Sequence, residues 1–122
     1  MSKILIAEDE RDIRELISFT LEHEGYDVIA TVNGEDALET VYQARPDLVL
    51  LNVRMPRMDG YEVCRRIKND ATIQHIPVAF ISAKGQQSEI DEGMRAGAVD
   101  YLLKPFSTGQ LVETVARLLS GE

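Results

Sequence analysis

The stretch DLVLLNVRMPRMDG, residues 47–60, decides the fold. Its first half is apolar at four consecutive positions, Leu48 to Leu51, with no alternation between polar and apolar side chains. A strand buried on both faces has this composition, and such strands occur in parallel sheets that helices cover on both sides. Asn52 closes the run, and Asp59 is a natural N-cap for a following helix. The stretch therefore predicts a buried parallel strand, a loop and a helix.

Strands and helices are expected to alternate five times along the chain. Apolar residues at helical spacing mark the helices, and Gly, Pro and Asn-Gly mark the turns. Expected strands cover residues 3–7, 26–31, 46–52, 78–82 and 99–103; expected helices cover about 12–24, 35–44 and 87–96, a segment after Asp59 and a segment opened by the capping box 107–110. Short connections make each crossover right-handed. The pattern predicts one doubly wound α/β domain over residues 1–122.

Two helices have apolar faces of different strength. The first is expected to turn four residues toward the sheet: Ile13, Leu16, Ile17 and Leu21. The helix at 87–96 is the poorest in apolar residues, and its inward candidates are Ile90 and Met94. Weak anchoring is typical of an element that shifts during function.

Composition and charge exclude several classes of function. The chain has 122 residues, the size of one domain. Its formal net charge of −8 argues against a nucleic-acid surface, which needs clustered Lys and Arg. No apolar run reaches the roughly 18 residues that cross a membrane, and no signal-peptide core follows Met1. The single cysteine, Cys64, excludes an internal disulfide. We therefore expect a cytoplasmic protein without membrane or nucleic-acid contacts.

Polar residues gather where the expected strands end. Glu8 and Asp9 follow the first strand, Asn52 and Ser82 end the third and fourth, and Lys104 follows the fifth. Parallel strands bring their carboxyl ends to one edge, where open α/β sheets bind ligands. Carboxylates, a hydroxyl and a lysine are the groups that metal-assisted phosphoryl transfer uses. Each residue also has a simpler structural explanation, but their conjunction on one edge favours a phosphoryl site.

Four stretches resemble the receiver domain of two-component response regulators: residues 4–10, 47–60, 77–84 and 97–106. The resemblance covers essentially the whole chain. It implies a CheY-like, flavodoxin-like (βα)5 fold with five parallel strands in the order 2-1-3-4-5. We expect no effector domain within these residues, whether the receiver stands alone or is part of a longer protein. The resemblance further implies a signalling module, not an enzyme, that takes a phosphoryl group from a histidine kinase or phosphotransfer protein with Mg²⁺.

The resemblance also implies roles for individual residues. Glu8 and Asp9 resemble the acidic pair that holds Mg²⁺, Asp9 directly and Glu8 through water, and the backbone carbonyl of Arg54 resembles a further ligand. The phosphoryl-sensing and switch positions are occupied by Ser82, Tyr101 and Lys104, and the Lys104–Pro105 bond resembles one that is cis in the family. The face formed by the fourth helix, the fifth strand and the fifth helix, where Arg95 and Arg117 are candidates, resembles the surface that docks an output partner or a second receiver.

Asn52 departs from the family pattern, because it stands at the position of the aspartate that accepts phosphate. An amide oxygen is neutral and forms no acyl phosphate. It can still ligate Mg²⁺ through its carbonyl, so we expect a weakened metal site, no phosphorylation and a protein held in the inactive state. Asn52 is either a replacement in an otherwise working receiver or a natural feature. The presence of Glu8, Asp9, Ser82 and Lys104 favours a replacement.

The residues after the first strand argue against two other classes of protein. An aspartyl phosphatase needs Asp-x-Asp there, where this chain has Glu8-Asp9-Glu10. A flavin site needs a Ser/Thr/Gly-rich phosphate loop there, and acids would repel the phosphate. The alternative that remains open is a pseudo-receiver that acts without phosphate, as a protein-binding adaptor.

Overall fold

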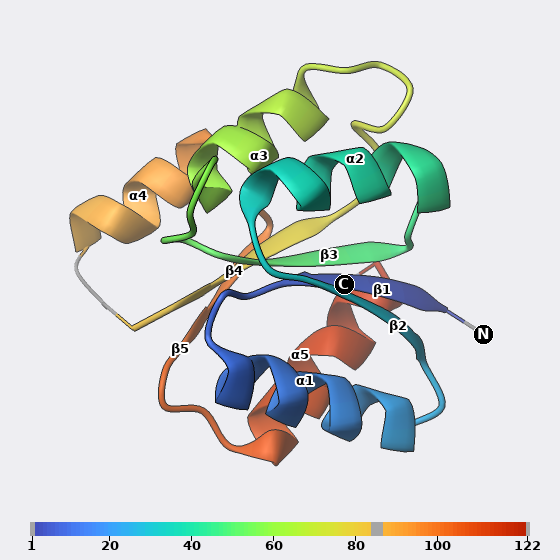
Figure 1. Cartoon of the computed structure of the whole chain (residues 1–122). Helices are drawn as coiled ribbons and strands as arrows, with labels where there is room; N and C mark the ends of the chain where they lie inside the picture. Colours follow the sequence, from blue (N-terminus) through green and yellow to red (C-terminus); the bar gives the residue numbers. More distant parts are fainter. Residues whose placement is uncertain (1, 84–86, 122) are drawn as a thin grey trace.

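The computed structural model describes residues 2–83 and 87–121. Within these residues five strands and five helices alternate (Figure 1). The strands are β1 (Lys3–Ala7), β2 (Asp27–Thr31), β3 (Leu48–Asn52), β4 (Val78–Ser82) and β5 (Asp100–Leu103); the helices are α1 (Arg11–His23), α2 (Gly34–Ala44), α3 (Gly60–Lys68), α4 (Gln87–Arg95) and α5 (Thr108–Leu119). Every element that the sequence predicts is present.

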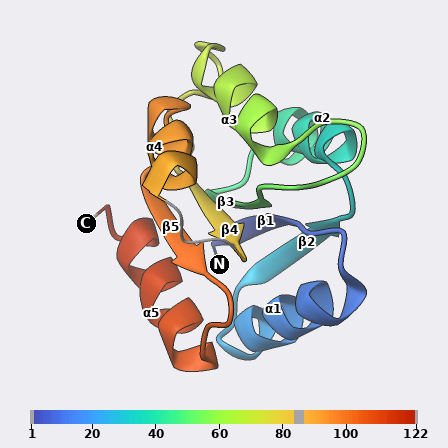
Figure 2. The same ribbon diagram turned by 90° about the vertical axis from the view of Figure 1, so that its left-hand side faces the viewer.

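The strands form one parallel sheet in the order β2-β1-β3-β4-β5. Helices α1 and α5 cover one face of the sheet, and α2, α3 and α4 cover the other (Figures 1 and 2). This arrangement confirms the predicted flavodoxin-like, doubly wound fold. Because all strands run the same way, the residues that follow them are collected at one edge.

The apolar run in β3 is explained by two hydrophobic cores, one on each face of the sheet. Leu48 and Leu50 belong to the core under α1 and α5, whereas Val49 and Leu51 belong to the core under α2 and α3. All five residues of β3 are buried. A strand that packs into both cores has no position left for an exposed polar side chain.

Polar caps fix the starts of three helices. Asn33, Asp59 and Ser107 each accept a hydrogen bond from a backbone N–H in the first turn of the helix that follows. Ser107 and Gln110 form the capping box that the sequence predicts. The cap at Asp59 determines where α3 begins, and therefore how the chain leaves the edge of the sheet after Asn52.

The expectation that Leu16 faces the core is wrong. Leu16 is 45% exposed, while Ile17 and Leu21 are fully buried. Leu16 lies at the rim of α1, where it lines a surface groove together with Pro105 and Phe106. The face of α1 that packs on the sheet is therefore narrower than the set of apolar residues at helical spacing predicts.

The expectation for Met94 is also wrong, because α4 approaches the sheet through a glycine. Met94 is 45% exposed, whereas Gly93 is buried. A Cβ atom on Gly93 would lie 2.9 Å from the ring of Phe80 and 3.0 Å from the ring of Tyr101. The missing side chain lets α4 rest directly on these two rings, and Met94 then points outward.

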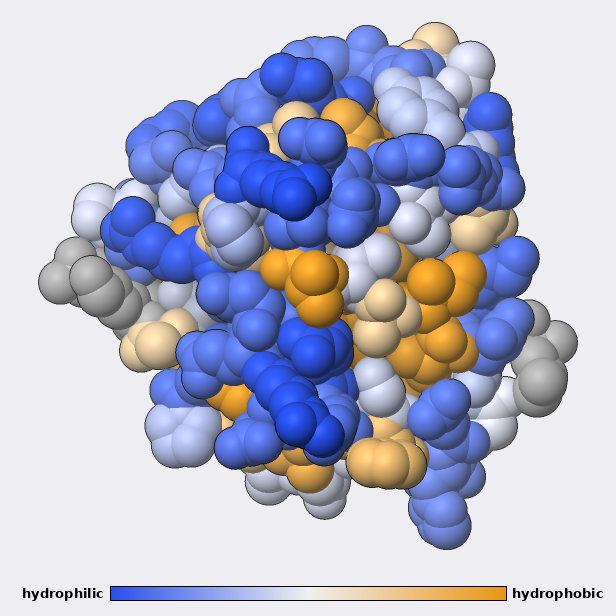
Figure 3. Space-filling view, in the orientation of Figure 1, coloured by the Kyte–Doolittle hydropathy of each residue, from blue (hydrophilic) through white to orange (hydrophobic). Residues whose placement is uncertain are grey.

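The surface in the orientation of Figure 1 is mostly hydrophilic (Figure 3). The largest apolar area in this view lies between the two helical layers, where Figure 1 has the edge strand β2. Among residues 2–83 and 87–121, no helix has the length and apolar content that crossing a bilayer requires.

Gly60 allows the first turn of α3 to pass close to the end of β3. A Cβ atom there would lie 2.4 Å from the backbone oxygen of Asn52. The colliding atom belongs to the backbone of β3, which cannot move away without disturbing the sheet. We therefore expect Gly60→Ala to lower the free energy of unfolding by at least about 2 kcal/mol. The measurement is urea denaturation followed by circular dichroism.

Gly109 provides the matched control, because it lies in the first turn of α5 and a Cβ atom added to it would have no neighbour closer than 3.8 Å. Gly109→Ala should be neutral or stabilising by up to about 1 kcal/mol, as for Ala in any helix. Equal stability changes in the two variants would contradict the close approach at Gly60.

Candidate functional site

Five polar residues from four strands meet at the carboxyl edge of the sheet. Glu8 and Asp9 follow β1, Asn52 and Ser82 end β3 and β4, and Lys104 follows β5. The strand register brings these residues to the same level of the sheet, because the strands end beside one another. Ala7 pairs with Leu51, Asn52 with Ile81, and Ser82 with Leu103. The edge holds a cavity of about 300 Å³. It is lined by Asp9, Glu10, Asn52, Val53, Arg54, Ser82, Ala83, Glu89 and Lys104.

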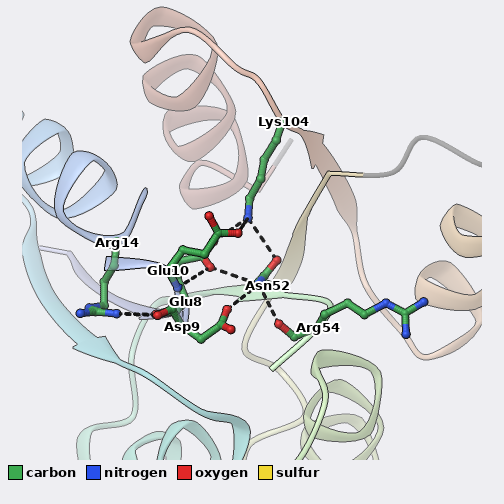
Figure 4. A network of polar contacts seen from close by, with 7 residues as sticks. All are labelled: Glu8, Asp9, Glu10, Arg14, Asn52, Arg54 and Lys104. Atoms are coloured by element: carbon green, nitrogen blue, oxygen red, sulfur yellow. Dashed lines mark hydrogen bonds and ion pairs between the residues drawn. The ribbon is translucent and has the colours of Figure 1, made fainter. Parts of the chain in front are cut away.

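The side-chain amide of Asn52 lies at the centre of this cluster (Figure 4). Its Nδ2 lies within hydrogen-bonding distance of Glu8 Oε2 at 3.1 Å, Asp9 Oδ1 at 3.1 Å and the Arg54 carbonyl oxygen at 2.8 Å, so its two N–H groups serve three acceptors and one of them is shared. Its Oδ1 accepts from Lys104 Nζ at 3.4 Å. Three oxygens therefore converge on the nitrogen side of the amide and a cation lies on its oxygen side.

Glu8 is a carboxylate with no exposed surface. Its Oε1 forms an ion pair with Lys104 Nζ at 2.9 Å, and its Oε2 accepts from the backbone N–H of Glu10. Burial raises the pKa of the Glu8 carboxyl above its ordinary value, and the hydrogen bond with Lys104 opposes this rise. The Lys104 side chain is itself only 11% exposed, so water stabilises neither charge well and each is stabilised mainly by the other.

Two arginines connect the cluster to neighbouring helices, Arg14 to α1 and Arg54 to α4. The Arg14 guanidinium, on α1, donates to the backbone oxygens of Glu8 and Asp9. The Arg54 guanidinium points away from the Asn52 amide (Figure 4) and pairs with Glu89 on α4 at 3.3 Å. Arg14 and Glu89 were not predicted from the sequence. No local motif marks them, since both contacts join residues of different elements.

Of the remaining predicted site residues, Ser82 lies in the cavity wall and Tyr101 lies outside it. Ser82 is buried and lines the cavity. Tyr101 does not line it; its ring packs against Phe80 with centroids 5.7 Å apart, on the side facing α4. The Lys104–Pro105 peptide bond is cis. The structure thus gathers Glu8, Asp9, Asn52, Ser82 and Lys104 in one place and leaves Tyr101 under α4.

The oxygens around Asn52 Nδ2 are suited to a divalent cation. Carboxylate and carbonyl oxygens are the ligands that Mg²⁺ prefers. Among the described residues no three His, Cys, Asp or Glu side chains gather as a metal site, so a cation here would depend on two carboxylates and neutral oxygens. The convergence of Glu8, Asp9 and the Arg54 carbonyl on one point fits such a cation.

The fold is shared with CheY-like proteins. CheY4, a chemotaxis response regulator of Vibrio cholerae, is 30% identical, and the match covers 97% of this chain and 98% of that chain with a TM-score of 0.92. The signal receiver domain of a signal transduction histidine kinase from Syntrophus aciditrophicus is 35% identical over 99% of this chain and 92% of that one, with a TM-score of 0.92.

A further similar structure contains a metal. The receiver domain of a Pseudomonas aeruginosa sensor histidine kinase, with a magnesium ion coordinated in its active-site cleft, is 28% identical over 98% of both chains, with a TM-score of 0.91. The family model of the response regulator receiver domain matches residues 4–116. The chain therefore belongs to the response regulator receiver domain family, whose members are modules of two-component signal transduction.

Lys104 should be required for the stability of the buried Glu8 carboxylate. Without the ammonium, the pKa of Glu8 rises further and ionisation of Glu8 costs more folding free energy. We therefore expect Lys104→Met to cost about 3 kcal/mol near pH 8, a value typical of a broken buried pair. The cost should shrink toward about pH 4, which is below the ordinary pKa of a glutamate, because Glu8 is then largely protonated in both folded and unfolded states.

Urea denaturation at the two pH values measures this difference. Arg11→Met is the matched control, because it also removes a cation from an ion pair, with Glu15, but both side chains are at least half exposed. It should cost no more than about 1 kcal/mol, with little pH dependence. A Lys104→Met cost that does not change with pH would contradict the role assigned to Glu8.

Proposed function

We propose that this chain is a receiver domain in which Asn52 stands at the phosphoacceptor position, so that it is not phosphorylated and stays in the inactive state. The observation that carries the proposal is the position of the residue 52 side chain, within hydrogen-bonding distance of Glu8, Asp9, Arg54 O and Lys104. A carboxylate placed there would be an activated nucleophile. An amide has no ionised oxygen with which to attack phosphorus.

The surrounding residues have the chemistry to support phosphoryl transfer to an aspartate at position 52. Lys104 Nζ lies on the oxygen side of residue 52 and would stabilise negative charge on a phosphoryl group. Ser82 supplies a hydroxyl on the cavity wall. Bound Mg²⁺ would neutralise the phosphoryl oxygens during transfer. Its ligands would be Asp9, Glu8, the Arg54 carbonyl and Asn52, whose neutral carbonyl binds it more weakly than a carboxylate.

The input partner is proposed to be a histidine kinase or phosphotransfer protein, and the output face to be α4, β5 and α5. Tyr101 lies on β5, and Arg95 is exposed on α4. Arg117 on α5 forms an ion pair with Asp100 at the start of β5. At Gly93, α4 meets the rings of Phe80 and Tyr101 without a side chain between them, so a change in the position of α4 would alter the surroundings of Tyr101.

One observation favours the second candidate, a phosphate-independent adaptor. Every polar atom of the Asn52 side chain has a hydrogen-bond partner in the unphosphorylated structure. The side chain at position 52 therefore needs no phosphoryl group to satisfy its hydrogen bonds. In that case the output face would bind its partner equally well whether residue 52 is Asn or Asp.

Asn52→Asp tests the first proposal. Incubated with Mg²⁺ and a small phosphodonor such as acetyl phosphate, the variant should gain one phosphoryl group on residue 52 that is labile in base, whereas the unaltered chain should gain none. Intact-mass and peptide mass spectrometry measure both. Asn69→Asp, the same replacement at the C-cap of α3, is the matched control and should stay unmodified.

Two outcomes would reject the proposal: a base-labile adduct on Asn52 itself, or no adduct on Asn52→Asp although it is folded. Once a partner is known, its affinity for phosphorylated Asn52→Asp separates the candidates. A change on phosphorylation supports the receiver, and unchanged affinity supports the adaptor.

A further inference from the structure

The orientation of the Asn52 amide follows from its neighbours. The Glu8, Asp9 and Arg54 oxygens on one side are acceptors, and Lys104 on the other side is a donor. With Nδ2 turned inward, all four contacts join a donor to an acceptor. With the amide reversed, Oδ1 would face three oxygens and Nδ2 would face an ammonium group. The neutral amide is therefore held in one orientation.

That orientation places N–H groups where the proposed cation would bind. A divalent ion held by Glu8, Asp9 and the Arg54 carbonyl would meet Nδ2, which has no lone pair available to ligate it. We propose that the Asn52 amide competes with a divalent cation for this pocket, and that the cation binds only when the amide rotates and turns Oδ1 inward. The inference rests on the proposed cation site, but not on phosphorylation.

Rotation of the amide would also affect Lys104. It would turn Nδ2 toward Lys104 Nζ, so that two donors face each other in place of the 3.4 Å hydrogen bond. Lys104 keeps its ion pair with Glu8 at 2.9 Å and lies 3.8 Å from Glu10. Cation binding should therefore release the lysine from residue 52 and leave it on the β1 side of the pocket.

The two effects of Asn52 on a cation oppose each other. Its carbonyl is a neutral ligand that a water molecule can replace, since Mg²⁺ keeps several waters in protein sites. Its N–H groups must give up hydrogen bonds to two carboxylates and a carbonyl, and hydrogen bonds to charged groups are the stronger kind. The hydrogen bonds that the N–H groups lose should cost more free energy than the carbonyl ligand contributes. Removing the Asn52 amide should therefore strengthen Mg²⁺ binding.

The test is a Mg²⁺ titration of the unaltered chain and of Asn52→Ala, followed by the backbone amide shifts around Asp9 in ¹⁵N–¹H NMR spectra. We expect Asn52→Ala to bind Mg²⁺ several-fold to about tenfold more tightly than the unaltered chain. Equal or weaker binding by folded Asn52→Ala, including no binding, overturns the proposal. Asn52→Ala/Asp9→Ala is the control, and it should lose the gain if the cation binds in this pocket.

The side-chain NH₂ signals of Asn52, assigned by their absence from Asn52→Ala, give an independent readout. Without Mg²⁺ they should exchange with water more slowly than those of the exposed Asn69, and Mg²⁺ should shift them at the same concentration as Asp9. Signals that stay unchanged while Mg²⁺ binds would show that no rotation occurs. Neither result depends on phosphate uptake by Asn52→Asp, so this inference and the proposed function can fail separately.

Discussion

The ion pair between Glu8 and Lys104 is the interaction on which the pocket depends. Glu8 has no exposed surface and Lys104 very little, and a buried charge deprived of its partner is strongly destabilising. Glu8 follows β1 and Lys104 follows β5, with β3 and β4 between them in the sheet. The lysine side chain must therefore reach across the ends of two strands, and this brings it past Asn52.

The charge balance explains why a neutral residue is well accommodated at position 52. Glu8 and Asp9 bring two negative charges next to residue 52 and Lys104 one positive charge, and the exposed Glu10 adds a negative charge 3.8 Å from Lys104. A carboxylate at position 52 would therefore be held beside Glu8 and Asp9 without a further cation. Carboxylates a few ångströms apart repel by several kcal/mol even at an effective dielectric constant near 20. The amide replaces that repulsion by hydrogen bonds to Glu8, Asp9 and the Arg54 carbonyl.

Features that depend on local pattern could be predicted from the sequence. The unbroken apolar run of β3 predicted a doubly covered parallel sheet, and parallel strands in turn placed Glu8, Asn52 and Lys104 at one edge. Contacts that depend on how helices rest on the sheet could not be predicted. Leu16 and Met94 match the helical period but lie outside the packed stripe. The direction of the Asn52 amide was likewise not predictable, because three of the four groups that set it, on Glu8, Asp9 and Lys104, lie more than forty residues away in sequence.

Two sets of contacts link the pocket to α4, one through Arg54 and one through the start of α3. Arg54 touches both the pocket and α4, through its carbonyl and its guanidinium, but its side chain is 78% exposed and such an ion pair contributes little. The backbone is the stiffer connection. The Gly60 N–H donates to Val53 O at 2.8 Å, and Gly60 passes too close to Asn52 for any side chain. Residue 52 is therefore in direct backbone contact with the start of α3. From there Tyr61, whose hydroxyl donates to the Glu89 backbone oxygen, connects it to the first turn of α4.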